Sequence, residues 1–400
     1  MYQALSTIYA PAACLLLILT SCRPTPPTDP TLHFINEPAA WKSILTEDST
    51  EHYFADLSET DLRLQMELPD SVAIDLDTYK EWLIQQLMSW PTDLQADVAA
   101  DWTQVLEECR VRFPALLPER VDLLLSNDEP YGSRIYFTRN SAVVMPLTDL
   151  ENAPRESLLN IFRHELFHLI SREHLELRKA LYALANFVPA PTELKWPDTL
   201  YVARLANPDA PNYDYMLDYD SSYYLPILHY PEPIDLEETT ERFSVNIRFD
   251  YYKLIGDSIT LDRLPEWKVS TATEANSPYL IHAEEVLAEH FALLLAGETE
   301  LDFPGELEDL KEMNDQASSS NSISSLTAGI SVKLSLTKLH QRHLGSPQPV
   351  NCWSWIFAQV SVIISVIRLT FSSVIGTLTV GCFPSLSMTR KLMPDSMTLR

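Results

Sequence analysis

The residues best suited to chemistry are two histidines and a glutamate close together in the chain. His164, Glu165 and His168 form an HExxH pattern, with the two histidines four positions apart. On a helix this spacing places both imidazoles one turn apart on the same face, close enough to bind a single Zn²⁺ ion. Glu165 lies beside that face, where its carboxylate can take a proton from a water molecule that attacks a carbonyl.

The residues around this pattern favour a largely buried helix. Leu166, Phe167, Leu169 and Ile170 are apolar, and Pro154 suits the first helical turn because its missing N–H costs nothing there. A buried His-Glu-His cluster is costly unless a metal ion or hydrogen-bond partners compensate for the lost hydration. The competing interpretation is a pair of ordinary core histidines with hydrogen-bond partners.

Two imidazoles leave a catalytic zinc ion one protein ligand short, and the sequence offers two main candidates for the third. Residues 283–295 have helical spacing, and on them Glu285 and Glu289 are one turn apart on one face. His174 is the other candidate, because it follows His168 by six positions.

With Glu285 and Glu289 in this arrangement, the chain resembles the gluzincins. In these thermolysin-like metallopeptidases the third ligand is a helical glutamate, followed four residues later by an acid. The resemblance implies that Glu285 binds the metal and that Glu289 accepts a hydrogen bond from a ligating imidazole, fixing its tautomer. Glu284 is a weaker alternative for the ligand.

His174 would instead match the metzincin pattern HExxHxxGxxH. Ser171 occupies the position of the glycine at which the chain leaves the helix in that pattern. A serine there more naturally continues the helix and directs His174 away from the metal. Met216 is only a faint counterpart of the metzincin Met-turn.

The gluzincin resemblance also implies a fold and a substrate. The fold is α+β and mainly α, zincin-like, with a small mixed sheet and an HExxH active-site helix. The strand at residues 142–145 takes the place where zincins align an extended peptide or protein substrate. Tyr279 and His282 precede the proposed ligand and are candidates to stabilise a developing oxyanion, although a structural role is the simpler interpretation of each.

The apolar spacing predicts the elements that position these residues. Further helices are expected at residues 74–90, 94–113 and 175–187, and strands sharing one sheet at 121–125, 134–138 and 142–145. After residue 187 and as far as about residue 240, abundant Pro, Asp, Asn and Tyr predict a long, loop-rich insertion.

Charge excludes one class of function. The net charge is -27, which would repel nucleic acid phosphates, so no nucleic-acid role is expected. Residues 318–400 depart from this composition, with seven basic residues and one acid. This break predicts that the metallohydrolase domain covers residues 51–317 and that the tail 318–400 does not belong to the fold.

The first residues resemble a bacterial lipoprotein signal. An apolar run at 12–19 leads into Leu-Thr-Ser-Cys, which implies a signal peptide at 1–21 and lipid attachment to Cys22. Unlike the usual pattern, no Lys or Arg precedes Cys22. The Pro-rich region 22–50 fits a flexible tether, so we expect the protein in the bacterial cell envelope, outside the cytoplasm, held to the membrane by the lipid.

Together these features predict an exported, lipid-anchored zinc metallopeptidase. The alternative is a non-enzymatic surface-anchored binding protein in which the metal braces the fold. Structural zinc sites are usually closed by four protein ligands, often Cys, and no cysteine is near His164 or His168 in the sequence.

Overall fold

The computed structural model describes residues 30–298, except for 50, 70, 133 and 231–246. These residues all belong to the first of two structural units. The predicted signal peptide, Cys22 and the tail 318–400 lie outside the described residues. No helix in the described part has both the length and the apolar character needed to cross a membrane.

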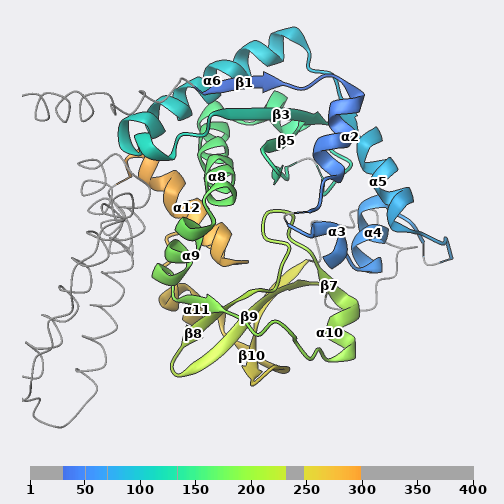
Figure 1. The fold of residues 1–400 in the computed structure, drawn as a ribbon, viewed down its shortest axis with the longest axis vertical. Helices are drawn as coiled ribbons and strands as arrows, with labels where there is room; N and C mark the ends of the chain where they lie inside the picture. The colour runs from blue at the N-terminus through green and yellow to red at the C-terminus, as the bar shows by residue number, and fades with distance from the viewer. Residues whose placement is uncertain (1–29, 50, 70, 133, 231–246, 299–400) are drawn as a thin grey trace, which may run out of the picture. The chain divides into compact units, whose positions relative to one another are not determined.

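The first sheet has five strands and mixed direction (Figure 1). Its strands are β1 (Thr31–Phe34), β2 (Leu87–Met88), β3 (Arg120–Ser126), β4 (Phe137–Arg139) and β5 (Ala142–Pro146). The order is β1-β3-β5-β4, in which β3 runs parallel to both β1 and β5, while β4 is antiparallel to β5 and β2 pairs antiparallel with β3. The prediction that strands near 121–125, 134–138 and 142–145 share one sheet is confirmed, although the second of them begins only at Phe137.

Helices bury both faces of this sheet. Side chains alternate between the faces of a strand, so Leu123 and Leu125 of β3 enter one apolar core while Leu124 enters another. The first core includes side chains of α6 (Thr92–Arg112), α8 (Arg155–Glu173) and α12 (Ala283–Ala296). The second includes side chains of α2 (Pro38–Thr46), α3 (Tyr53–Asp56), α4 (Glu59–Met66) and α5 (Leu76–Gln85). The sheet is therefore a central layer between two sets of helices. Because β1 and α2 belong to this layer and its core, the folded domain begins before residue 51, where the tether was expected to end.

Helices α8 and α12 pack directly against each other in the first core (Figure 1). Pro154 precedes the first residue of α8, and His174 follows the last. The side chain of His282 caps the N-terminus of α12 by accepting a hydrogen bond from the backbone N–H of Glu284. Gly297 ends that helix with φ 81°, a left-handed conformation that glycine adopts without steric cost.

The second sheet is antiparallel and has six strands. They are β6 (Phe187–Pro189), β7 (Arg204–Leu205), β8 (Tyr215–Tyr219), β9 (Ser222–His229), β10 (Arg248–Ile255) and β11 (Ser258–Leu264). The expected α+β class, the mixed sheet and the helix that carries the HExxH pattern are confirmed, and about half of the described structure is helical. The second, antiparallel sheet was not predicted.

The predicted loop-rich insertion is only partly right as far as residue 230. Residues 190–197 and 206–214 are irregular connections, whereas β7, β8 and β9 were not expected. Asp220 and Ser221 both have positive φ and connect β8 to β9 as a two-residue hairpin. Residues 231–240 of the predicted insertion lie outside the described part.

Two predicted helices end earlier than the sequence pattern suggested. The helix expected to reach residue 90 ends at Gln85, and Leu87 and Met88 then pair with β3 as strand β2. The helix expected at 175–187 is α9 (Leu175–Leu184). Asn186 then takes a left-handed conformation and Phe187 begins β6. Three short helices complete the described structure: α7 (Leu147–Asn152), α10 (Asp198–Ala203) and α11 (Glu266–Ala272), beside a 3₁₀ turn at Pro114–Leu116.

Candidate metal centre

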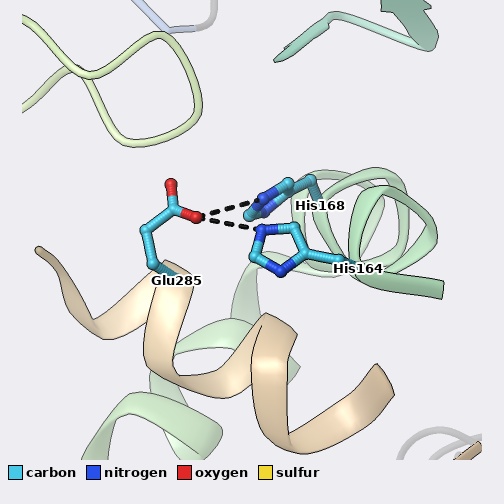
Figure 2. A group of neighbouring side chains, drawn as sticks. All are labelled: His164, His168 and Glu285. Atoms are coloured by element: carbon cyan, nitrogen blue, oxygen red, sulfur yellow. Dashed lines mark hydrogen bonds and ion pairs between the residues drawn. The ribbon is translucent and has the colours of Figure 1, made fainter. Parts of the chain in front are cut away.

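Two packed helices bring the predicted ligands together. Figure 2 shows His164 and His168 on α8 pointing toward Glu285, which is presented by α12. The imidazole rings lie one turn apart, with centroids separated by 4.7 Å and ring planes at 79°. The three residues can each offer one ligand atom, and these atoms lie within 4.8 Å of one another.

Both histidines direct the same ring nitrogen at the same carboxylate oxygen. Oε2 of Glu285 lies 3.0 Å from Nε2 of His164 and 3.6 Å from Nε2 of His168. Nε2 of His168 is buried and makes no hydrogen bond. A buried polar nitrogen without a hydrogen-bond partner is costly, and a shared cation between the three groups would remove that cost. The chemistry of this donor set therefore fits a divalent metal ion.

Two further carboxylates hold the opposite nitrogens of the rings. Nδ1 of His164 lies 3.0 Å from Oε1 of Glu289, and Nδ1 of His168 lies 3.1 Å from Oε1 of Glu284. A carboxylate accepts a hydrogen bond from Nδ1–H, which fixes the tautomer and leaves Nε2 available for a metal. Glu289 is therefore placed as the gluzincin resemblance implies. Glu284 contacts Nδ1 of His168, the nitrogen that faces away from Glu285, and it is not part of the triad. The structure therefore does not support Glu284 as the alternative third ligand.

Glu284 is itself firmly held although its side chain is fully buried. Ser171 and Tyr182 donate hydrogen bonds to its two oxygens, and Arg178 lies 3.7 Å away. Burial raises the pKa of Glu284, but Arg178 and His168 outweigh that effect and lower the pKa to about 2. The carboxylate is therefore ionised and can accept a hydrogen bond from Nδ1–H of His168.

The structure adds Asn207, which the sequence analysis missed. Its Nδ2 donates a hydrogen bond of 2.6 Å to Oε1 of Glu285, the oxygen that does not face the imidazoles. Its Oδ1 accepts a hydrogen bond of 3.0 Å from the backbone N–H of Asp209. Asn207 thus joins the third member of the triad to the segment between β7 and β8. No periodic pattern in the sequence marks this residue.

Without a metal ion, protons hold the cluster together. Burial lowers the pKa of His164, but hydrogen bonds to Glu285 and Glu289 outweigh burial and raise it to about 9. For Glu285, burial raises the pKa, whereas the charge of His168 and a hydrogen bond from His164 lower it well below its usual value. A divalent cation can replace these protons as the positive charge among the carboxylates.

Glu165 lies beside the triad and is buried, with 3% of its surface exposed. Its Oε2 makes no hydrogen bond. Glu165, His168 and Asp209 can each offer one ligand atom, and these three atoms lie within 4.8 Å of one another. Burial, followed by the charge of Asp209, raises the pKa of Glu165 to about 8. A carboxylate with a pKa near neutrality is suited to accept and return a proton.

A cavity of about 270 Å³ opens onto His164, Glu165 and Glu285. Residues 134–136, just before β4, line it, together with apolar side chains of α8 and α12. The strand expected to align a substrate, β5, does not fit that role, because β3 and β4 already pair with its two edges.

The remaining predicted residues divide between the cavity and its surroundings. Tyr279 lines the cavity, with its ring centroid 5.9 Å from that of His164. His282 caps α12 and lines a separate cavity, so the structure gives it a structural role. Burial lowers the pKa of His282 to about 4. His174 ends α8 and Met216 lies in β8, and neither joins the groups of potential metal ligands among the described residues.

No family model, curated protein or solved structure matches the chain. The resemblance to the gluzincins therefore depends on the HExxH motif, on Glu285 and Glu289, and on their geometry. The fold and the site together define an α+β protein with a buried His-His-Glu group that can hold a metal ion.

Proposed function

We propose that the chain is a zinc-dependent metallopeptidase with His164, His168 and Glu285 as ligands and Glu165 as general base. One observation carries the proposal: Nε2 of both histidines faces a single oxygen of Glu285, at 3.0 and 3.6 Å. Two imidazoles and one carboxylate are a ligand set that catalytic zinc sites use, with a further position left for water or substrate.

The ion would lower the pKa of a water molecule and polarise the substrate's carbonyl oxygen. Glu165 lines the cavity beside the triad, so its carboxylate can accept a proton from the attacking water. The same carboxylate can then return the proton to the leaving amine as the carbon–nitrogen bond breaks. The products are one free carboxyl group and one free amine.

A surface-anchored binding protein with a structural metal is the second candidate. A structural site would be closed by four protein ligands. Here the triad opens onto a cavity of about 270 Å³ that Glu165 also lines, which supports catalysis. The buried Glu165 carboxylate without a partner on Oε2 has no evident structural purpose in a binding protein.

Replacing Glu165 with glutamine separates the two candidates. The amide keeps the size of the side chain but cannot accept the proton, so we expect Glu165→Gln to retain zinc and to lose hydrolysis of a peptide library by at least about 100-fold. Glu173→Gln is the matched control, because Glu173 is an exposed glutamate at the end of the same helix. Equal hydrolysis by wild type and Glu165→Gln would contradict the mechanism, and zinc binding without any hydrolysis by wild type would favour the binding protein.

We also propose that the protein is exported and held at the membrane by a lipid on Cys22, which lies outside the described residues. Cys22 is the only thiol in the lipoprotein-like motif. Cys22→Ser should therefore abolish incorporation of a labelled fatty acid and move the protein to the soluble fraction. Membrane attachment that persists in Cys22→Ser would contradict the lipid anchor.

A further inference from the structure

Asp209 brings an additional carboxylate into the candidate metal centre. It lies between β7 and β8, is 6% exposed, and lines the same cavity as Glu165 and Glu285. Two hydrogen bonds hold the segment that carries Asp209. The side chain of Asn207 donates to Glu285, and the backbone N–H of Ala206 donates to Oδ1 of Asp61 at 3.0 Å. Asp209 therefore has a defined position relative to the triad.

Only one oxygen of Asp209 is used by the protein. Thr138 donates to Oδ1 through its backbone N–H, at 2.8 Å, and through its hydroxyl group. Arg172 adds a longer contact of 3.4 Å to the same oxygen. Oδ2 accepts no hydrogen bond from any described residue, although the carboxylate lines the cavity. A rigidly held carboxylate with one oxygen left over is suited to receive a donor from a ligand.

The position of Asp209 determines which group of a bound peptide its carboxylate can contact. Its carboxylate lies within 4.8 Å of the ligand atoms of Glu165 and His168, beside the place where the scissile carbonyl must react. In a peptide, the nitrogen of a residue is about 2.5 Å from that residue's own carbonyl carbon, because a single Cα separates them. The scissile amide nitrogen is closer still, at about 1.3 Å from that carbon, but it cannot carry a positive charge before the bond breaks. The nitrogen of the residue whose carbonyl is attacked can, if it is the N-terminus of the peptide.

The charge in the cavity indicates the form of that nitrogen. Four carboxylates line the cavity, namely those of Glu165, Asp209, Glu285 and Glu289. The basic residues that line it among those described are His164, which would be a neutral ligand when zinc is bound, and Arg134, whose side chain is 86% exposed and 3.7 Å from Asp149. A bound zinc ion would offset two of the four carboxylate charges and leave the cavity acidic. Such a surface favours a cationic ammonium group over a neutral amide and repels a terminal carboxylate.

We propose that the site is an aminopeptidase site, which removes the first residue from peptides with a free N-terminus, and that Oδ2 of Asp209 accepts a hydrogen bond from the substrate's α-ammonium group. This inference rests on the proposed peptidase function. The reaction consumes one water molecule: its oxygen joins the first carbonyl carbon, the first peptide bond breaks, and a proton passes to the nitrogen of the shortened peptide. Asp209 binds the ammonium group and takes no proton.

A pair of substrates that differ only at the N-terminus tests this proposal in the full-length protein. Alanyl-p-nitroanilide and N-acetyl-alanyl-p-nitroanilide present the same bond to the site with and without the ammonium group. We expect the kcat/KM of wild type for alanyl-p-nitroanilide to be at least 100-fold higher than for the acetylated substrate. A long peptide should lose residues one at a time from its N-terminus, as followed by mass spectrometry.

Asp209→Asn should reduce this preference at least tenfold, mainly through a higher KM for the substrate with the free amine. Loss of the Asp209 charge beside Glu165 affects the hydrolysis of both substrates, so the ratio of the two kcat/KM values is the quantity that tests the role of Asp209. Asp214→Asn is the matched control, because Asp214 is an exposed acid nearby on the chain that does not line the metal cavity. Unchanged melting temperature and zinc content of Asp209→Asn would exclude a general loss of structure.

Three results would overturn the proposal. Equal hydrolysis of the two wild-type substrates, or internal cleavage of the long peptide, would leave the peptidase function in place and reject the aminopeptidase. A preference that Asp209→Asn retains in full would reject the role of Asp209. Hydrolysis of neither p-nitroanilide nor any library peptide by zinc-loaded wild type would reject the proposed function itself.

Discussion

The side chains of Asn207 and Glu285 are joined by a hydrogen bond of 2.6 Å across 78 positions of the sequence. The amide donates to Oε1, while Oε2 of the same carboxylate faces both imidazoles. The bond therefore sets the rotation of the carboxylate that would bind the metal. Outer hydrogen-bond partners of this kind orient ligands before the ion arrives.

Asn207→Ala should lower zinc affinity by about 10- to 100-fold, because Glu285 would lose the partner that fixes its carboxylate. Competition with a chromophoric chelator measures the change. Asn212→Ala is a suitable control, since Asn212 belongs to the same connection but lines a different cavity. An affinity equal to that of wild type would show that Glu285 is oriented without Asn207.

Glu284 and Glu289 should differ in their support of the two histidines. The side chain of Glu284 is fully buried beside His168, whereas that of Glu289 is 32% exposed beside His164. Charge interactions weaken with exposure to solvent. Glu284→Gln should therefore lower zinc affinity at least tenfold and Glu289→Gln only a few-fold, by isothermal titration calorimetry. The reverse order would contradict the assignment of Glu284 as the principal support.

Asp61 should make stability fall as the pH rises. It is fully buried, and burial raises its pKa to about 6, from 3.8, despite hydrogen bonds from Ser58 and Ala206. Between pH 3.8 and pH 6 the folded state binds this proton more often than the unfolded state does. The stability that Asp61 contributes is therefore fully present at low pH and disappears as the pH rises past the pKa of about 6 in the folded state. From pH 5 to pH 7.5 the contribution should fall by about 1.4 kcal/mol.

Urea unfolding of wild type and Asp61→Asn at several pH values checks this effect. Since asparagine does not titrate, the stability of wild type relative to the variant should decrease as the pH rises through this range. A difference that is constant with pH, or that increases, would show that folding does not raise the pKa of Asp61.

The helices that carry the triad were predictable from sequence, because each is long and has a continuous apolar pattern. The acids behind the histidines were only partly predictable. Glu289 follows Glu285 by one helical turn, but the contact between Glu284 and His168 depends on how α8 and α12 cross. Local spacing on one helix cannot specify that crossing.

Asn207 and Asp209 were not predictable, for a physical reason. They lie in a short connection without periodic pattern, whose position depends on contacts distant in sequence. Asp61 holds Ala206 from 145 positions away, and Thr138 holds Asp209 from 71 positions away. The strands β8 and β9 were missed because their turn residues resembled those of a loop. The exclusion of β5 from substrate alignment likewise required the observed strand order.

The zinc content of the purified full-length protein tests the central claim most directly. By elemental mass spectrometry, wild type should bind about one zinc ion per chain, and Glu285→Ala should lose most of it because one of the three proposed protein ligands is removed. His174→Ala should retain the metal, since His174 lies outside the triad. Loss of zinc from His174→Ala with retention by Glu285→Ala, or a wild-type protein that binds no zinc, would contradict this account of the site.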